Sequence, residues 1–147
     1  MECKKKKVVL KEVTTFTKEE IKKILSFHTT QESFYYDMLV ILFMCGQRPS
    51  EVCGLKCKNV IDTGITLTNG LNKYGHDTNL KTKKSRRSYD LPKSIVSSLK
   101  QKCIGKESDD YVFLNSLGNP VTPNALSANL TKLLKKYNKE NPNDNCA

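Results

Sequence analysis

An arginine at the expected start of a helix is the residue in this sequence best suited to chemistry. Arg48 stands directly before Pro49 in the segment GQRPSEVCGL, residues 46–55, which follows an apolar stretch. Proline is favoured in the first turn of a helix, because its missing N–H would have no partner there. We therefore expect the Arg48 guanidinium to lie beside free N–H groups at a helix amino terminus, an arrangement that binds phosphate. A capped helix with an ordinary surface arginine is the alternative that this short motif leaves open.

A second candidate segment, residues 80–92 with the sequence LKTKKSRRSYDLP, is strongly basic. Between Ile65 and Tyr89 there are six basic residues and one acidic residue, Asp77. The basic residues are Lys73, Lys81, Lys83, Lys84, Arg86 and Arg87. A hairpin with this charge is expected to lie along nucleic acid phosphates and to add salt-sensitive affinity. An exposed sheet edge kept soluble by lysine is the alternative.

Together the two segments resemble the tyrosine recombinases of the phage integrase family. Members have a G-x-R-x-S-E-L box followed by G-L-x-W-x-D-I, to which residues 46–52 (GQRPSEV) and 54–61 (GLKCKNVI) correspond here. They then have a hairpin similar to K-T-x-x-S-x-R-x-I-x-L-P, to which residues 81–92 correspond. Residues 110–121 (DYVFLNSLGNPV) are similar to the family stretch that follows. The resemblance runs from about residue 16 to about residue 137 in family order.

The resemblance implies DNA strand cleavage and rejoining through a 3′-phosphotyrosyl link. Without a metal, fixed cations must neutralise the negative charge that gathers on the scissile phosphate. By resemblance, Arg48 grips this phosphate and Lys81 protonates the leaving 5′-oxygen. Lys83 and Lys84 remain alternatives for that lysine. Glu51 is expected to support Arg48, or only to follow the preference for acidic residues at a helix start.

The family pattern continues with an H-x-L-R-H box and later a nucleophilic tyrosine, which this sequence does not supply. We therefore expect an amino-terminal, catalytically incomplete part of a recombinase catalytic domain. Tyr137 ends an apolar helical stripe and is expected in the core. Two functions stay open, an incomplete DNA integrase and a non-catalytic DNA-binding remnant or regulator. RNA binding is a more remote third, disfavoured because only Tyr74 and Tyr89 offer stacking rings on the hairpin.

The composition favours a polyanionic partner. The chain has 147 residues, with 25 Lys and Arg against 15 Asp and Glu, and a formal net charge of +10. We expect the partner to be double-stranded DNA, on which the resemblance implies that complete relatives form homo-oligomers. No apolar run could span a membrane and no signal peptide is evident, so we expect a cytoplasmic protein without a membrane partner. A solvated basic face with no partner is the alternative that charge alone leaves open.

Six cysteines raise the question of metal sites and disulfides. Cys53 and Cys57 are close in sequence, but the only histidines, His28 and His76, are far from both. No second close pair of cysteines completes a typical zinc pattern. We expect no metal and no cofactor, and thiols that are free and buried or half-buried.

The elements that must position these residues follow from hydrophobic periodicity and capping signals. Five helices are expected, the first beginning with a capping box at residues 17–20 and the last with a Thr122–Pro123 cap. Their ranges are 18–27, 31–45, 49–55, 94–102 and 122–137. Residues 65–91 predict three short antiparallel strands with turns at 69–70, 75 and 84–85, and residues 111–113 a short extended segment.

The fold class that follows from these elements is α+β, mainly helical with a small three-stranded antiparallel sheet, and the resemblance implies that it is a recombinase catalytic core. We expect one partial catalytic domain over residues 16–137. Residues 1–15 are expected to be a basic linker, and the polar residues 138–147 a disordered tail.

Overall fold

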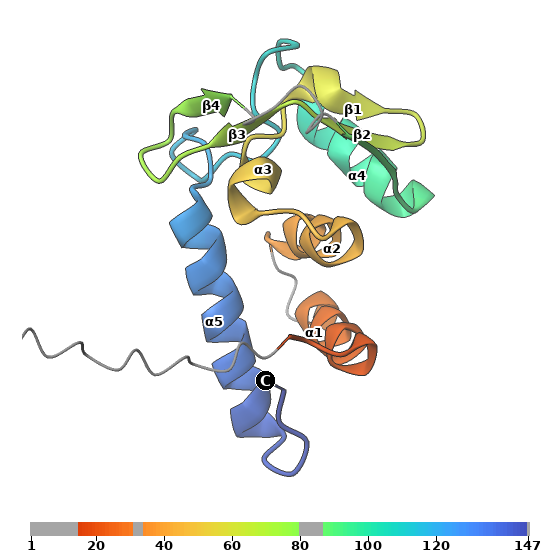
Figure 1. Ribbon diagram of the computed structural model, residues 1–147, viewed down its shortest axis with the longest axis vertical. Coiled ribbons are helices and arrows are strands. Elements are labelled where there is room, and N and C mark those ends of the chain that lie inside the picture. The colour runs from red at the N-terminus through yellow and green to blue at the C-terminus, as the bar shows by residue number, and fades with distance from the viewer. Residues whose placement is uncertain (1–14, 31–33, 80–86, 147) are drawn as a thin grey trace, which may run out of the picture.

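A computed structural model describes residues 15–30, 34–79 and 87–146 (Figure 1). Within them the helices are α1 (Lys18–Thr30), α2 (Tyr36–Cys45), α3 (Pro49–Cys53), α4 (Lys93–Cys103) and α5 (Pro123–Glu140), with a 3₁₀ turn, η1 (Cys57–Asn59). The strands are β1 (Val60–Ile61), β2 (Gly64–Leu67), β3 (Asn69–Leu71), β4 (Asp77–Asn79) and β5 (Arg87–Asp90). The long helix α5 runs along one side, α1 and α2 lie beside it, and the strands and α4 occupy the far end (Figure 1).

The strands form two separate antiparallel sheets. A small three-stranded antiparallel sheet is confirmed, in the order β1-β2-β5, with Ile65 opposite both Val60 and Tyr89. Its strand β1 lies before residues 65–91, the range in which the three strands were expected. A second, two-stranded sheet pairs β3 with β4. The turn expected at residues 69–70 is wrong, because Gly70 pairs with Thr78 inside this hairpin. The turn expected at residue 75 is confirmed, because the chain reverses at residues 72–76, where Gly75 has a φ of +81° that favours glycine. The turn expected at residues 84–85 lies outside the described residues.

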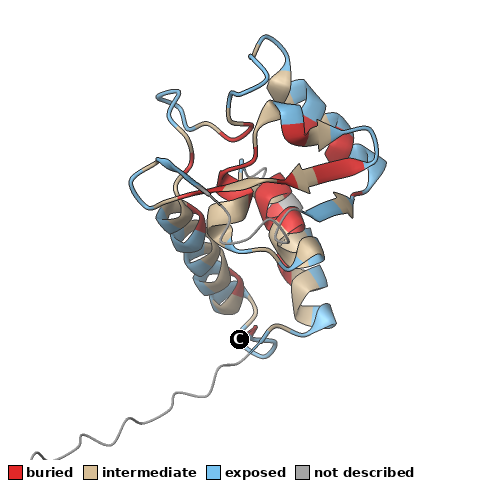
Figure 2. Cartoon of the chain, turned by 45° about the horizontal axis from the view of Figure 1, so that its top comes forward, coloured by how far each residue is buried: buried red, intermediate tan, exposed pale blue. Residues whose placement is uncertain are grey.

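The main core lies where the helices meet the three-stranded sheet, and its buried residues form a continuous cluster (Figure 2). Helix α2 is apolar on most sides, and Met38, Leu39 and Ile41 are completely buried. They pack with Ile65 of β2 and Phe113, which are also completely buried. A helix that is apolar all round must be central, as the sequence predicted for this one.

Two helix starts have the side-chain caps that the sequence predicted. The Thr17 N–H donates to the Glu20 carboxylate at 2.8 Å, and the Glu20 N–H donates to the Thr17 hydroxyl at 3.2 Å. At α5 the Thr122 hydroxyl accepts from the Ala125 N–H at 3.3 Å. Helix α1 is three residues longer than expected, ending at Thr30. Helix α2 begins at Tyr36, and residues 31–33 of the expected second helix lie outside the described part of the chain.

The carboxy-terminal segment is ordered by specific contacts, so the expectation of disorder over residues 138–147 is wrong for the part described, residues 138–146. Residues 138–140 continue α5. The Asn138 amide then bonds the backbone of Cys146 in both directions, donating to its carbonyl at 3.1 Å and accepting from its N–H at 2.8 Å. Asp144 pairs with Lys23 of α1, and Cys146 is buried against Tyr137. These contacts are not periodic, which is why the sequence pattern did not reveal them.

Among the helices that the structure describes, none combines the length and the apolar character needed to cross a membrane.

Candidate nucleic-acid interface

The corner between α2 and α3 holds Arg48 at the start of a helix, as the sequence predicted. Arg48 is the N-cap of α3, with extended backbone angles, and Pro49 is the first helical residue. The Arg48 carbonyl accepts from the N–H groups of Glu51 and Val52 at 3.0 and 3.2 Å. The N–H of Glu51 is therefore used inside the turn. Because α3 has only five residues, its dipole is small, and the exposed guanidinium of Arg48 must supply most of the positive charge.

Glu51 supports this corner through the backbone. Its carboxylate accepts a hydrogen bond from the Arg48 N–H at 3.1 Å. The contact fixes the backbone of Arg48 while its side chain stays exposed. Over the described residues, no ion pair joins the two side chains, so Glu51 acts on Arg48 through this capping bond.

A second contact ties the same corner to the three-stranded sheet. The Gln47 amide donates to the Cys45 carbonyl at 2.7 Å and to the Tyr89 hydroxyl of β5. Gly46, with a φ of +61°, ends α2 and turns the chain into this corner. Nothing in the sequence around Gln47 indicates this role, and Tyr89 was expected only as a stacking ring. No local signal could have found the pair, because its members are 42 residues apart.

Two of the basic residues expected on the hairpin lie within the described structure. Lys73 occupies the exposed turn between β3 and β4, and its ammonium lies 5.0 Å from the ring centroid of Tyr74, which is 72% exposed. Arg87 is the exposed first residue of β5. The other four, Lys81, Lys83, Lys84 and Arg86, lie outside the described residues, so their roles stay predictions.

The β3–β4 hairpin packs directly on the end of α3. A Cβ atom added to Gly54 would lie 2.7 Å from the carbonyl carbon of Gly70, so the two backbones touch. The Asn69 amide donates to the Gly54 carbonyl at 3.0 Å. The hairpin is therefore fixed to the same short segment whose other end begins at Arg48. In the sequence Gly54 is only one residue of the family motif, and nothing near it indicates this contact.

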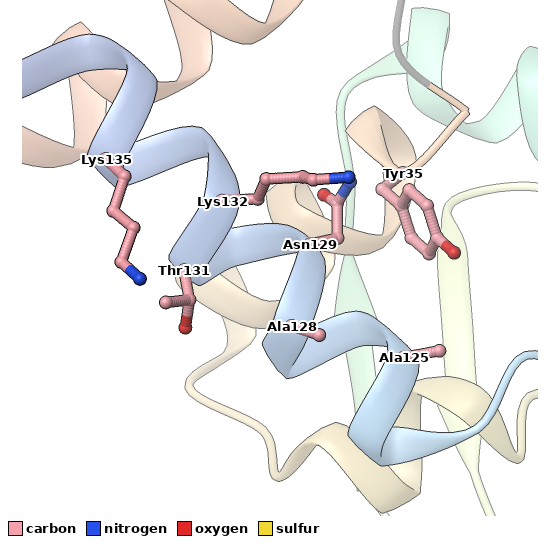
Figure 3. Close-up of a pocket in the computed structure, with 7 residues that line it drawn as sticks. All are labelled: Tyr35, Ala125, Ala128, Asn129, Thr131, Lys132 and Lys135. Atoms are coloured by element: carbon pink, nitrogen blue, oxygen red, sulfur yellow. The ribbon is translucent and has the colours of Figure 1, made fainter. Parts of the chain in front are cut away.

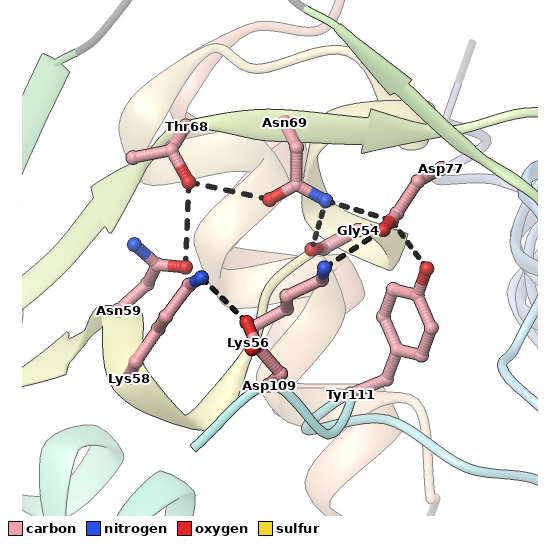
Figure 4. A network of polar contacts seen from close by, with 9 residues as sticks. All are labelled: Gly54, Lys56, Lys58, Asn59, Thr68, Asn69, Asp77, Asp109 and Tyr111. Atoms are coloured by element: carbon pink, nitrogen blue, oxygen red, sulfur yellow. Dashed lines mark hydrogen bonds and ion pairs between the residues drawn. The ribbon is translucent and has the colours of Figure 1, made fainter.

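A polar network surrounds this junction (Figure 4). The Asp77 carboxylate accepts from Lys56 at 2.7 Å, from Asn69 at 3.1 Å and from the Tyr111 hydroxyl. Partial burial alone raises the pKa of Asp77, but the hydrogen bonds from Lys56 and Tyr111 outweigh it and leave the pKa below its ordinary value. Burial and the adjacent carboxylate raise the pKa of Tyr111. At neutral pH the network therefore contains a charged Asp77 and a neutral Tyr111.

A hollow of about 550 Å³ lies elsewhere, along one face of α5 (Figure 3). Its lining consists of Tyr35, Ala125, Ala128, Asn129, Thr131, Lys132 and Lys135. The hollow includes none of the residues expected to bind phosphate.

His28 of α1 is completely buried, and its ring nitrogens and the Asn129 amide oxygen reach no hydrogen-bond partner among the described residues. Burial lowers the pKa of His28.

The described cysteines are free thiols, as expected. Burial raises the pKa of Cys53 to about 12, which keeps this thiol protonated and unreactive at neutral pH. Within the described ranges, no three His, Cys, Asp or Glu side chains come together as metal ligands could.

The chain matches a known family. The family described as "Phage integrase family" matches residues 14–145 of the chain. None of the curated proteins matches this chain.

Solved structures of integrases and recombinases share the fold. The integrase of transposon Tn1549, bound to circular intermediate DNA, has a TM-score of 0.73 and 23% identity, covering 89% of this chain and 48% of its own. A complex of that integrase with transposon right end DNA has a TM-score of 0.69 and 24% identity, covering 90% and 49%. The XerA recombinase has a TM-score of 0.60 and 13% identity, covering 92% and 46%. The chain spans about half the length of these structures, and at such identities the likeness concerns the fold.

Proposed function

Because this chain belongs to the phage integrase family of tyrosine recombinases, we propose that it acts in DNA integration or site-specific recombination by binding double-stranded DNA. The proposal depends on how the backbone of Arg48 is held at the start of α3. Its backbone is fixed by the Glu51 carboxylate and by the first turn of α3, while its guanidinium is exposed. A planar fork on a fixed backbone suits a bidentate grip on a phosphate.

We propose separate roles for the basic residues in this interface. Arg48 grips the scissile phosphate, and Lys81 protonates the leaving 5′-oxygen, with Lys83 and Lys84 as alternatives for that lysine. Glu51 keeps Arg48 in place. The remaining basic residues between β3 and the start of β5 hold neighbouring phosphates and set the dependence of affinity on salt. They are Lys73, Arg86 and Arg87, together with whichever of Lys83 and Lys84 does not take the catalytic role.

The proposal extends to assembly and location. Integration and recombination join two DNA sites, so we propose that copies of the whole protein associate on DNA. A cytoplasmic location is proposed with it, since the DNA substrate must be within reach. The high net charge of +10 supports a polyanionic partner and adds long-range attraction to the encounter.

DNA binding by the 147-residue protein tests the proposal directly. The protein is titrated into a fluorescent duplex at several salt concentrations, and the logarithm of affinity is expected to fall linearly with the logarithm of salt. Arg48→Ala is expected to weaken binding more than Lys100→Ala, a control that removes the same charge from an exposed residue of α4 paired with Asp62. Arg48→Lys, which keeps the charge but not the fork, is expected to lie between them.

Two outcomes contradict the proposal in different ways. Absence of duplex binding at low salt removes DNA as the partner. Equal losses for Arg48→Ala and Lys100→Ala leave general basicity as the cause of binding and remove the phosphate-gripping role of Arg48. Enrichment of one sequence from a random duplex library would favour a site-specific protein over a nonspecific one.

A further inference from the structure

Three separate segments meet at one carboxylate, that of Asp77 at the start of β4 (Figure 4). Its donors are Lys56, which follows α3, Asn69 of β3, and Tyr111, whose backbone forms an antiparallel bridge with that of Lys56. The Asp77 side chain is 47% exposed but that of Lys56 only 15%, so one side of the ion pair is fixed in the protein. A single exposed ion pair contributes little, whereas several donors on one carboxylate restrict its position.

These contacts anchor the β3–β4 hairpin on the side of the α3 segment. Asn69 bonds the Gly54 carbonyl as well as Asp77, and the Gly54 and Gly70 backbones touch. Each strand of the hairpin has only three residues. A hairpin of that size is not stable without packing against other structure. The direction in which its turn projects therefore depends on this anchor.

The turn at the end of the hairpin presents a cation. Lys73 is exposed, and its ammonium rests 5.0 Å from the Tyr74 ring centroid. Arg48 lies at the opposite end of the α3 segment to which the hairpin is anchored. One continuous stretch of contacts thus connects the two exposed cations.

We infer that Asp77 is a positioning residue, which holds the β3–β4 hairpin on the α3 segment so that Lys73 meets a phosphate of the same duplex that Arg48 binds. The inference rests on the proposed function, because it assigns a role in DNA binding. Asp77 itself does not touch DNA. It acts through Lys73, and its removal changes which phosphates the protein can reach at once.

A double-mutant cycle on the 147-residue protein tests this role. Lys73→Ala is made in the unmodified chain, in an Asp77→Ala background and in an Asp62→Ala background. Asp62 is the matched control, an exposed carboxylate paired with Lys100 instead of a hairpin residue. In the unmodified chain, Lys73→Ala is expected to lower the magnitude of the slope of log affinity against log salt by about 1. The same fall is expected with Asp62→Ala and no fall with Asp77→Ala.

A milder variant separates loss of the hairpin position from loss of the fold. Tyr111→Phe removes one donor to Asp77 but keeps the ring, and it is expected to reduce the effect of Lys73→Ala partly. Circular dichroism and thermal melting confirm that each background is folded before binding is compared. A general loss of structure would lower affinity without cancelling the effect of Lys73→Ala specifically.

The outcomes separate the inference from the proposed function. If the unmodified chain does not bind duplex DNA, the proposed function fails and the inference falls with it. If the chain binds but Lys73→Ala lowers the slope equally in all three backgrounds, only the positioning role of Asp77 is overturned. If Lys73→Ala has no effect in the unmodified chain, the hairpin turn does not contact DNA, which also overturns it.

Discussion

The side-chain amide of Gln47 donates a hydrogen bond to the hydroxyl of Tyr89, which joins the corner preceding α3 to strand β5. Gln47 also donates to the Cys45 carbonyl at the end of α2. The side chain of Gln47, the residue before Arg48, thus connects the end of α2 to the three-stranded sheet. The corner is held from the sheet side by Gln47 and from the helix side by Glu51.

Tyr89→Phe is expected to destabilise the protein by about 1 kcal/mol, because it removes one partly buried hydrogen bond and leaves the Gln47 amide with a single partner. Duplex affinity is expected to fall as well, since the neighbouring Arg48 becomes less well fixed. Urea denaturation and duplex titration measure the two effects. Tyr74→Phe is the control, the same change on an exposed ring. Equal stability of the two variants would contradict the bracing role of Tyr89.

Gly54→Ala is expected to cost about 1–3 kcal/mol, because its Cβ would meet the backbone of Gly70, which cannot move without displacing β3. Gly54 has a φ of −80°, so the loss would come from contact and not from backbone conformation. Gly70→Ala is the matched comparison. Its Cβ would meet the Thr78 hydroxyl, the end of a side chain that can rotate, so its cost is expected to be smaller. Urea denaturation giving the opposite order would contradict this account of the junction.

Stability is expected to fall as pH drops below 6.5, the ordinary pKa of the histidine side chain. Burial lowers the pKa of His28 in the folded state, so the unfolded chain binds more protons between that pKa and 6.5. The lowered pKa values of Asp62, Asp77, Asp109 and Asp144 act only from about 3.8 downward. Urea denaturation between pH 5 and pH 7.5, a window that spans the ordinary histidine pKa, measures this slope.

His28→Leu is expected to flatten that slope, because the buried titrating group is gone. His76→Leu, the same change at an exposed position on the β3–β4 hairpin, is measured beside it as the control. A slope that persists in His28→Leu would assign the pH dependence to other groups.

Local signals in the sequence predicted the helical part of this fold well. The box of Thr17 and Glu20, the Thr122 cap and Pro49 after Arg48 each act over three residues or fewer, so sequence alone contains them. The α+β class and the presence of a small antiparallel sheet followed from the same kind of pattern, whereas strand β1 and the separate pairing of β3 with β4 did not.

The parts that could not be predicted depend on distant partners. The pair Asn69-Gly70 is typical of a turn, but Gly70 lies in strand β3. There its backbone contacts Gly54, with no room for a side chain on Gly54 between them. Asp77 was counted only as the one acidic residue of a basic hairpin, yet its donors come from positions 56, 69 and 111. The Arg48 position was predictable from its neighbours, whereas the contacts that hold it in place were not.

The antiparallel bridge between Lys56 and Tyr111 pairs two backbone segments that are far apart in the sequence. On either side of it the Cys57 N–H bonds the Asp110 carbonyl and the Val112 N–H bonds the Leu55 carbonyl, both at 2.9 Å. The segment from η1 to α4, which includes both sheets, therefore begins and ends at paired strands of backbone. Its buried residues complete the main core with α2, and its β3–β4 hairpin packs on α3, so the sheets cannot change without disturbing the helices. Only the exposed turns of this segment, such as the one that holds Lys73, can gain or lose residues while the helices and sheets that support them stay the same.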